Sequence, residues 1–173
     1  MGWKIKGLKK DAISITSDWD LVNQPLIHGV VTKAVKNVIK NSGVLTEIWR
    51  KSWALDDLPV DQVFQVTLNP GEISDWHLHE FTTDRLFVNS GAVKIVLYDS
   101  REDSPTFGLI NEFNIGQARP MLVVVPPKVC HAIQSIHHQQ SSLINLVDKA
   151  YSYADPDHWR VPFDTDAIAY KLR

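Results

Sequence analysis

The chain has 173 residues, of which 44% are hydrophobic and 22% charged, the range of a soluble globular protein with one core. The formal net charge of −2 excludes the strong positive charge expected of a protein that binds nucleic acid or an anionic membrane. Cys130 is the single cysteine, which excludes an intrachain disulfide, and the first residues lack a long apolar run. We therefore expect a cytoplasmic protein.

Short segments rich in β-branched and aromatic residues follow one another from residue 27 onward, separated by turn residues. In chain order they are 27–39, 44–53, 61–68, 74–81, 85–91, 92–99, 121–127, 130–136 and 141–148. This regular series predicts an all-β sandwich or barrel. We expect an N-terminal arm with a short helix over residues 1–26, one domain over residues 27–173, and a helical turn after Pro156.

Two histidines on one predicted strand, His77 and His79, are separated by a single residue. Because side chains alternate between the faces of a strand, both imidazoles point to one face, and Trp76 and Leu78 point to the other. Two imidazoles buried on one face need polar partners.

Two further polar residues can reach that face. Asp84 follows the pair across a short loop, and His131 follows a Pro-Pro turn at the end of an apolar strand. Together with His77 and His79 they suit one divalent transition metal (Fe, Mn, Ni or Zn), with open positions for water or substrate. Acid–base catalysis without a cofactor is the alternative.

The spacing resembles the first cupin motif, with aspartate where that motif has glutamate. The matching residues are Gly71, His77, His79, Asp84 and Gly91. Pro126 and His131 match part of the second motif, whose glycine and asparagine are replaced by Lys128 and Ser135. The resemblance implies a cupin double-stranded β-helix, a jelly-roll barrel with short peripheral helices and its site inside the barrel mouth.

A longer resemblance extends over residues 27–168. The stretch DSREDSPTFG at 99–108 resembles the D-x-R-x-x-S-P-T-F-G segment of the dTDP-4-dehydrorhamnose 3,5-epimerases, where it is expected to be a structural turn. VVPPKVCHAI at 124–133 resembles their I-P-P-G-F-A-H-G-F segment, and YSYADPDHWRVPFDTDAI at 151–168 resembles their ending. These enzymes are metal-free cupins, usually dimers, that epimerise a 4-keto sugar attached to a nucleotide.

The resemblance implies roles for individual residues. His77 matches the histidine that removes the proton next to the ketone, and a looser alignment selects His79. Asp164 matches the aspartate that holds this histidine, with Asp166 as the second choice. The histidine of the Pro-Pro segment is His131, which is expected to contact substrate.

The chain also departs from the family at three functional positions. The arginine that binds the diphosphate falls at Ser74, and the lysine that steadies the enolate falls at Asp84. The acid tyrosine falls near Ile144 or Asn145.

Tyr151 and Tyr153 match a later pair of family tyrosines, one of which stacks on the nucleotide base, and Tyr153 is the selected candidate. Arg50, Arg85 or Lys94 is expected to substitute for the missing arginine, with Arg85 as the selected candidate.

Three functions remain open from the sequence. The first is epimerisation or isomerisation of a keto sugar by proton abstraction next to the ketone, and we expect this sugar to be linked to a nucleotide. The second is a metal-dependent cupin enzyme, either a dioxygenase or an isomerase of a small acid or sugar. The third is a cupin that binds a small ligand without catalysis. A homodimer is implied by the resemblance, with the strand near residues 30–39 crossing to a partner.

Overall fold

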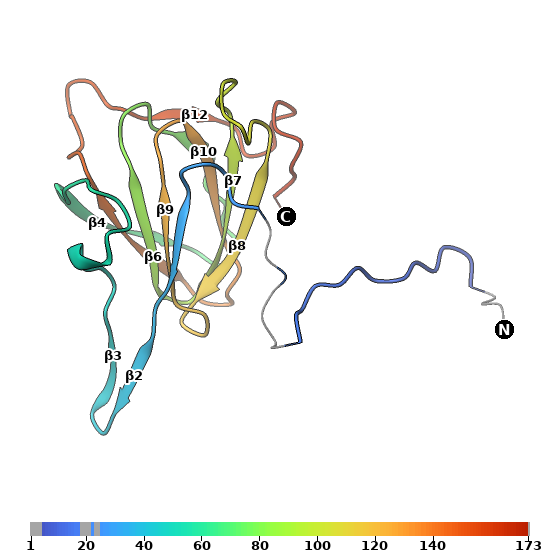
Figure 1. The fold of residues 1–173 in the computed structure, drawn as a ribbon, viewed down its shortest axis with the longest axis horizontal. Coiled ribbons are helices and arrows are strands. Elements are labelled where there is room, and N and C mark those ends of the chain that lie inside the picture. The colour runs from blue at the N-terminus through green and yellow to red at the C-terminus, as the bar shows by residue number, and fades with distance from the viewer. Residues whose placement is uncertain (1–4, 18–21, 23–24, 173) are drawn as a thin grey trace.

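The computed structural model describes residues 5–17, 22 and 25–172, and in these the chain forms two packed antiparallel sheets (Figure 1). The first sheet has the order β1 (Val31–Ala34), β9 (Met121–Val125), β6 (Asp84–Ser90), β11 (Ser141–Val147) and β4 (Gln62–Leu68). The second has the order β12 (Trp159–Val161), β5 (Trp76–Leu78), β10 (Val129–Ser135), β7 (Ala92–Asp99) and β8 (Ile110–Gly116). The predicted all-β jelly roll is confirmed.

Two strands were missing from the sequence-based prediction. In β8 the buried polar Asn111 interrupts the apolar alternation, and β12 has only three residues.

The predicted short helices are wrong for the described residues, in which the single helical element is the 3-10 turn η1 (Lys51–Trp53). No helical turn follows Pro156, where the chain instead runs toward β12. Part of the predicted N-terminal helix lies outside the described residues. No described helix is long and apolar enough to cross a membrane.

The main core lies between the sheets and follows from the alternation of each strand. In β7, Val93, Ile95 and Leu97 face this core, whereas Val96 faces the other side of the sheet. Inward residues of β6, β8, β9, β10 and β11 and of the segment before β1 also belong to this core.

A second apolar cluster covers the outer face of the second sheet and decides which way β5 presents its side chains. Trp76 is completely buried there against the C-terminal Ile168 and Leu172, and Leu78 packs against the same cluster. Because strand residues alternate, burial of Trp76 and Leu78 outside turns His77 and His79 inward, as predicted. Cys130 lies in this outer cluster, where burial raises its pKa to about 12, so the thiol is an inert core group.

The segment at 99–108 is a closed polar network, and its predicted structural role is confirmed. The buried Asp99 carboxylate accepts hydrogen bonds from Arg101 Nε (2.7 Å), Ser104 Oγ (2.6 Å) and Thr106 Oγ1 (2.6 Å). Burial alone would raise the pKa of Asp99, but these donors outweigh it and hold the pKa well below its usual value. Arg101 also donates to the His28 carbonyl at 2.7 Å, which ties the start of the barrel to this turn.

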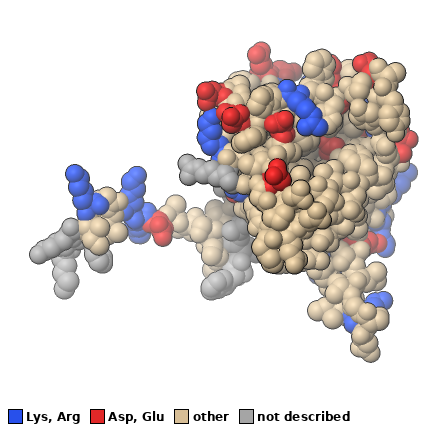
Figure 2. All heavy atoms as spheres, turned by 180° about the vertical axis from the view of Figure 1, so that it is seen from behind, with Lys and Arg blue, Asp and Glu red and all other residues tan. Residues whose placement is uncertain are grey.

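The hairpin of β2 (Asn37–Lys40) and β3 (Gly43–Thr46) projects from the barrel (Figures 1 and 2). Its tip is the turn predicted at 41–43. Its exposed apolar side chains are Val38, Ile39, Val44 and Leu45. An exposed apolar hairpin of this kind is typical of an interaction surface.

Candidate active site

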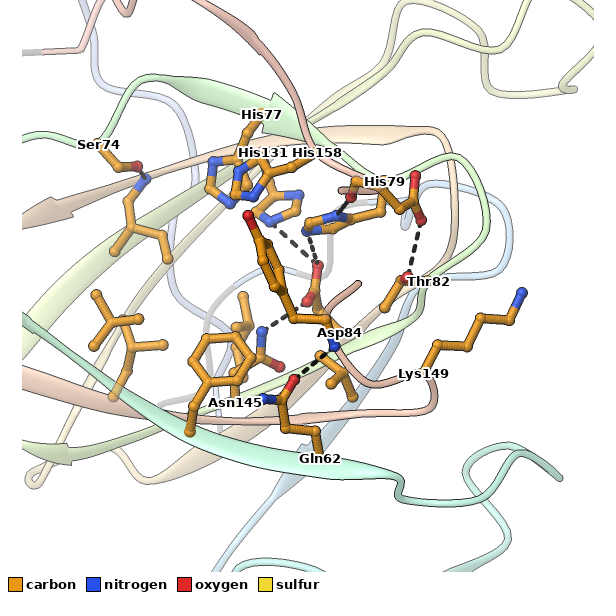
Figure 3. A pocket seen from close by; sticks show the side chains of 18 of the residues that line it. Gln62, Ser74, His77, His79, Thr82, Asp84, His131, Asn145, Lys149 and His158 are labelled. Carbon is orange, nitrogen blue, oxygen red and sulfur yellow. Dashed lines mark hydrogen bonds and ion pairs between the residues drawn. The ribbon is translucent and has the colours of Figure 1, made fainter. Parts of the chain in front are cut away.

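A cavity of about 380 Å³ lies between the two sheets at one end of the barrel. One wall is apolar, because β4 presents every second residue to it, including Phe64, Val66 and Leu68. The opposite sheet carries the histidines at β5 and β10, and Asp84 enters the cavity from the start of β6, in the same sheet as β4 (Figure 3). The cavity therefore offers one apolar face and one face of titratable groups.

Strand register brings the histidines together. His131 of β10 pairs directly with His77 of β5, and Arg160 of β12 pairs with His77 from the other side, so the three side chains share one face. The ring centroids of His77 and His131 are 4.0 Å apart, and the ring of His79 lies 5.9 Å from each. The structure thus assembles the histidines that the sequence motif selected.

Backbone carbonyls fix the orientation of these three rings. His77 Nδ1 lies 3.1 Å from the Asp75 carbonyl oxygen, His131 Nδ1 lies 3.2 Å from that of Val129, and His79 Nδ1 is hydrogen-bonded to that of Asp157. A carbonyl oxygen only accepts, so each Nδ1 carries the proton and donates. In the neutral form each Nε2 is left with a lone pair.

Asp84 stands between two of these rings. Its carboxylate is almost completely buried, and Oδ2 lies 3.4 Å from the Nε2 atoms of both His79 and His131. The other oxygen, Oδ1, accepts a hydrogen bond from Asn145 Nδ2 at 2.7 Å. Asn145 in turn accepts from the Arg85 backbone N–H through Oδ1, which fixes the orientation of its amide.

Burial disfavours the charged form of two of these imidazoles, His77 and His131. Burial lowers the pKa of His77 well below its ordinary value, and the neighbouring His131 lowers it further. Burial lowers the pKa of His131 to about 3, and His79 contributes in the same direction. A neutral imidazole with a free Nε2 can act as a proton acceptor or as a metal ligand.

A fourth histidine, His158, joins the cluster although the sequence gave no reason to select it. Its ring centroid lies 5.0 Å from that of His77 and 4.9 Å from that of His79. Its buried Nε2 atom has no hydrogen-bond partner among the described residues. Burial lowers the pKa of His158, and Arg160 lowers it further.

Asp157 fastens the segment that carries His158. Its carboxylate accepts hydrogen bonds from the backbone N–H groups of Glu80 (2.6 Å) and Phe81 (3.0 Å) and from Thr82 Oγ1 (2.9 Å). Its carbonyl receives the His79 Nδ1 hydrogen bond described above. The only sequence signal here is an acidic residue after a Pro turn, which does not indicate a contact with residues 79–82.

The structure corrects the role predicted for Arg85. The guanidinium is fully buried on the face of β6 opposite the cavity, where Nε donates to Asp56 at 2.8 Å. The remaining nitrogens bond Asp56 again and the carbonyls of Leu58, Pro59 and Leu146. These contacts stabilise the segment around residues 56–59 and leave Arg85 outside the cavity.

Asp164 is also placed differently from the prediction. It is exposed and does not line the cavity, and its carbonyl accepts from Lys171 Nζ at 3.2 Å. Asp166, the second choice, pairs with Lys171 at the surface. The carboxylate beside the histidines is Asp84, so the prediction of Asp164 as the orienting group is corrected.

The mouth of the cavity carries the remaining candidates. Lys149, Tyr151 and Arg160 line it, and the Tyr151 backbone N–H donates to Gln62 Oε1 at 2.9 Å. Tyr153 is 89% exposed and does not line the cavity, although its ring packs edge to face on Tyr151. Its predicted contact with a nucleotide base stays a prediction. Ser74, at the position of the missing arginine, lines the cavity too.

A jelly-roll barrel of two antiparallel sheets, with histidines and Asp84 lining a cavity at one end, defines a cupin. A family model described as dTDP-4-dehydrorhamnose 3,5-epimerase matches residues 25–170, and the chain belongs to this family. It is 32% identical over 141 residues to a probable low-salt glycan biosynthesis epimerase, Agl13, of Haloferax volcanii, covering 81% of this chain and 90% of the relative.

Solved structures have the same fold. A dTDP sugar isomerase from Desulfovibrio desulfuricans superposes with a TM-score of 0.78 at 20% identity, covering 84% of this chain and 91% of that one. The 3'-monoepimerase ChmJ of Streptomyces bikiniensis, solved in complex with dTDP-quinovose, superposes with a TM-score of 0.75 at 22% identity, covering 86% of this chain and 77% of that one.

Proposed function

We propose that this protein epimerises or isomerises a keto sugar by removing a proton from the carbon next to the ketone. The observation that carries the proposal is the cluster of His77, His79 and His131 in the cavity, each ring held through Nδ1 by a backbone carbonyl, in a chain of the epimerase family. Alternatives in which the barrel only binds a ligand, or performs oxidative chemistry, are not favoured by this family membership.

The base is an imidazole that accepts the proton on Nε2. His77 is the first choice, because it holds the position of the family's base in the sequence and its Nδ1–H is fixed on the Asp75 carbonyl. His79 is the second choice. Removal of the proton leaves an enolate, and return of a proton to the opposite face of the same carbon inverts its configuration.

The enolate oxygen needs positive charge or hydrogen-bond donors close by. Asp84 occupies the position of the family's lysine, and the cations that line the cavity, Lys149 and Arg160, lie at its mouth. A divalent transition metal held by His77, His79, Asp84 and His131, as predicted from the sequence, would supply such charge. This cofactor is a proposal separate from the reaction itself.

We propose that the substrate is linked to a nucleotide. ChmJ, which has the same fold, was solved with dTDP-quinovose. In the present chain Arg160 and Lys149 are at the cavity mouth, where they would meet a diphosphate outside the sugar pocket. Arg160 therefore replaces Arg85 as the candidate for the missing arginine.

Assembly and location are also proposals. The apolar side chains of the β2–β3 hairpin support a homodimer, because a second copy would cover them. The arm over residues 1–26, the domain over residues 27–173 and the cytoplasmic location stay as predicted from the sequence. Size-exclusion chromatography with light scattering tests the dimer, and a monomer after Ile39→Asp would locate its interface.

Incubation with dTDP-4-keto-6-deoxyglucose, followed by NMR of the sugar ring, tests the reaction. The wild-type protein is expected to change the configuration next to the ketone. His77→Gln is expected to lower the rate by about 10²–10⁴-fold, the usual contribution of a general base. His137→Gln, at the turn after β10, is the matched control and should keep the wild-type rate. Full activity in both His77→Gln and His79→Gln would contradict the proposal.

A further inference from the structure

Of the residues of β4 that line the cavity, Gln62 is polar, and Phe64, Val66 and Leu68 are apolar. We propose that the side-chain amide of Gln62 donates a hydrogen bond to the ketone oxygen of the substrate, and to the enolate oxygen that this ketone becomes. The assignment rests on the proposed function, because it names the group that stabilises the enolate of that reaction. Gln62 is then a catalytic residue that the sequence did not select.

A backbone contact fixes the orientation of the Gln62 amide (Figure 3). Oε1 accepts a hydrogen bond from the Tyr151 backbone N–H at 2.9 Å, and only the oxygen of an amide can accept. The Nε2 group is therefore turned away from this N–H. Its two N–H donors have no acceptor within the part of the chain that the structure describes. Donors that line a cavity without a protein acceptor are available to a ligand.

Strand register places Gln62 at the depth of the histidine cluster. Asn145 of β11 pairs with Leu86 of β6 on one side and with Phe64 of β4 on the other. Two residues along these strands, Asp84 and Gln62 therefore flank the same point of β11. Neighbouring strands are about 4.8 Å apart, so the backbones at Asp84 and Gln62 are separated by roughly 10 Å. Asp84 contacts the imidazoles, and the amide of Gln62 faces the cavity from the same level.

The positions of amide and base suit removal of a proton next to a ketone. The proton leaves perpendicular to the plane of the forming enolate, whereas the negative charge collects on the oxygen, which lies in that plane. Base and donor must therefore approach the sugar from different directions, as His77 on β5 and Gln62 on β4, in the opposite sheet, can do. A donor that is already oriented stabilises this charge without reorganising as the charge develops.

The electron balance needs no proton from the amide. The C–H bond breaks, its electron pair forms the carbon–carbon double bond, and the carbonyl π pair moves to the oxygen. The proton is held by the imidazole, and Gln62 keeps both of its N–H protons throughout. Return of a proton to the carbon reverses these movements and restores the ketone.

Other donors in the cavity already have partners. Asn145 Nδ2 donates to Asp84 at 2.7 Å, and Thr82 Oγ1 donates to Asp157 at 2.9 Å. Lys149 Nζ lies at the mouth, 5.3 Å from the centre of an aromatic ring. Gln62 is therefore the amide in this cavity whose donors are free to meet a ketone oxygen.

Two variants and a matched control test the assignment by deuterium exchange into dTDP-4-keto-6-deoxyglucose. Gln62→Glu keeps an oxygen for the Tyr151 N–H and loses the donors, and Gln62→Met loses the donors without adding charge. Both should lower the exchange rate by about 10²–10³-fold, the usual cost of one oxyanion donor. Gln65→Glu, on the exposed face of the same strand, should keep the wild-type rate. A wild-type rate in Gln62→Met would overturn the assignment, because a loss in Gln62→Glu alone would be an effect of charge.

The ¹³C NMR signal of the bound ketone is a measurement that does not depend on turnover. A donor at the ketone oxygen polarises the carbonyl and moves the signal of a labelled ketone carbon downfield. We expect this shift with the wild type and Gln65→Glu and its loss in both Gln62 variants, while the dissociation constant changes by less than about 10-fold. A signal that stays unshifted at saturating wild-type protein would overturn the assignment. So would a shift that persists in both Gln62 variants and disappears in Ser74→Ala.

The proposed reaction and the role of Gln62 fail separately. A shifted ketone signal with no deuterium exchange in the wild type would refute the reaction and leave the hydrogen bond from Gln62. Exchange at the wild-type rate in both Gln62 variants would refute the role of Gln62 and leave the reaction.

Discussion

Two buried aspartates, Asp99 and Asp84, differ in how their carboxylates are satisfied. Asp99 receives hydrogen bonds from a guanidinium and two hydroxyls, and its network is closed. Asp84 receives one amide hydrogen bond on Oδ1, and its Oδ2 lies 3.4 Å from the Nε2 atoms of His79 and His131. A buried carboxylate whose oxygens all receive hydrogen bonds, a closed network, stabilises the fold. A carboxylate with an oxygen that receives none, an open network, is available to a ligand when it lines a cavity.

The largest expected effect is loss of the closed network. Asp99→Asn leaves Arg101 without its buried partner and places an amide N–H₂ group against other donors. We expect the free energy of unfolding to fall by about 3–4 kcal/mol, as when a buried ion pair is broken. Urea denaturation measures it, with the exposed Asp103→Asn as the control that should change by less than about 0.5 kcal/mol.

Arg85, the residue next to Asp84, belongs to a second closed network on the opposite face of the strand. Arg85→Met leaves Asp56 and three carbonyls without their donor, so we expect a loss of about 2–3 kcal/mol in the free energy of unfolding. Arg50→Met, which breaks only an exposed pair with Glu47, should cost less than about 1 kcal/mol. Equal losses in the two variants would show that Arg85 is not the structural residue described here.

The pH dependence of the free energy of unfolding gives a smaller effect, and it comes from the network around Asp99. The pKa of Asp99 is lower in the folded protein than the value of about 3.9 in an unfolded chain. Its contribution is therefore complete above about pH 5 and is lost as the pH falls through and below about 4. Denaturation of the wild type and Asp99→Asn at pH 7 and pH 3 should show the difference between them shrinking by about 1–2 kcal/mol. A constant difference would show that the Asp99 charge does not stabilise the fold.

The smallest expected change in the free energy of unfolding comes from Asp84 in the histidine cluster. Unlike the two changes above, it is not a destabilisation. In metal-free protein Asp84→Asn keeps the oxygen that accepts from Asn145 and places an amide N–H₂ group beside the Nε2 atoms of His79 and His131. We expect the free energy of unfolding to stay unchanged or to rise by up to about 1 kcal/mol, while metal binding is lost. A destabilisation as large as that of Asp99→Asn would show that both oxygens of Asp84 already have hydrogen-bond donors in the metal-free protein.

The sequence predicted the parts of this site that depend on local alternation and on motif spacing. His77 and His79 turn inward because Trp76 and Leu78 turn outward, and Asp84 and His131 follow from the cupin spacing. The same alternation would have excluded Arg85, since a strand that sends Asp84 into the cavity sends the next residue away from it.

Other parts depend on contacts between distant segments. Asp164 matched a family aspartate by position, but the path of the C-terminal segment is set by packing of Ile168 and Leu172 against Trp76. His158 and Arg160 reach the cavity through β12, a strand of three residues that forms by pairing with β5. So short a strand has no periodicity to detect, and its partner is about eighty residues away in the sequence.

The central claim is that this cavity removes a proton next to a sugar ketone. The most direct measurement is mass spectrometry and NMR of dTDP-4-keto-6-deoxyglucose after incubation with the wild-type protein in heavy water. We expect deuterium at the carbon next to the ketone, at a rate that saturates with substrate and is absent after heat denaturation of the protein. Failure to incorporate deuterium into this or any other nucleotide-linked keto sugar that binds the protein would contradict the claim.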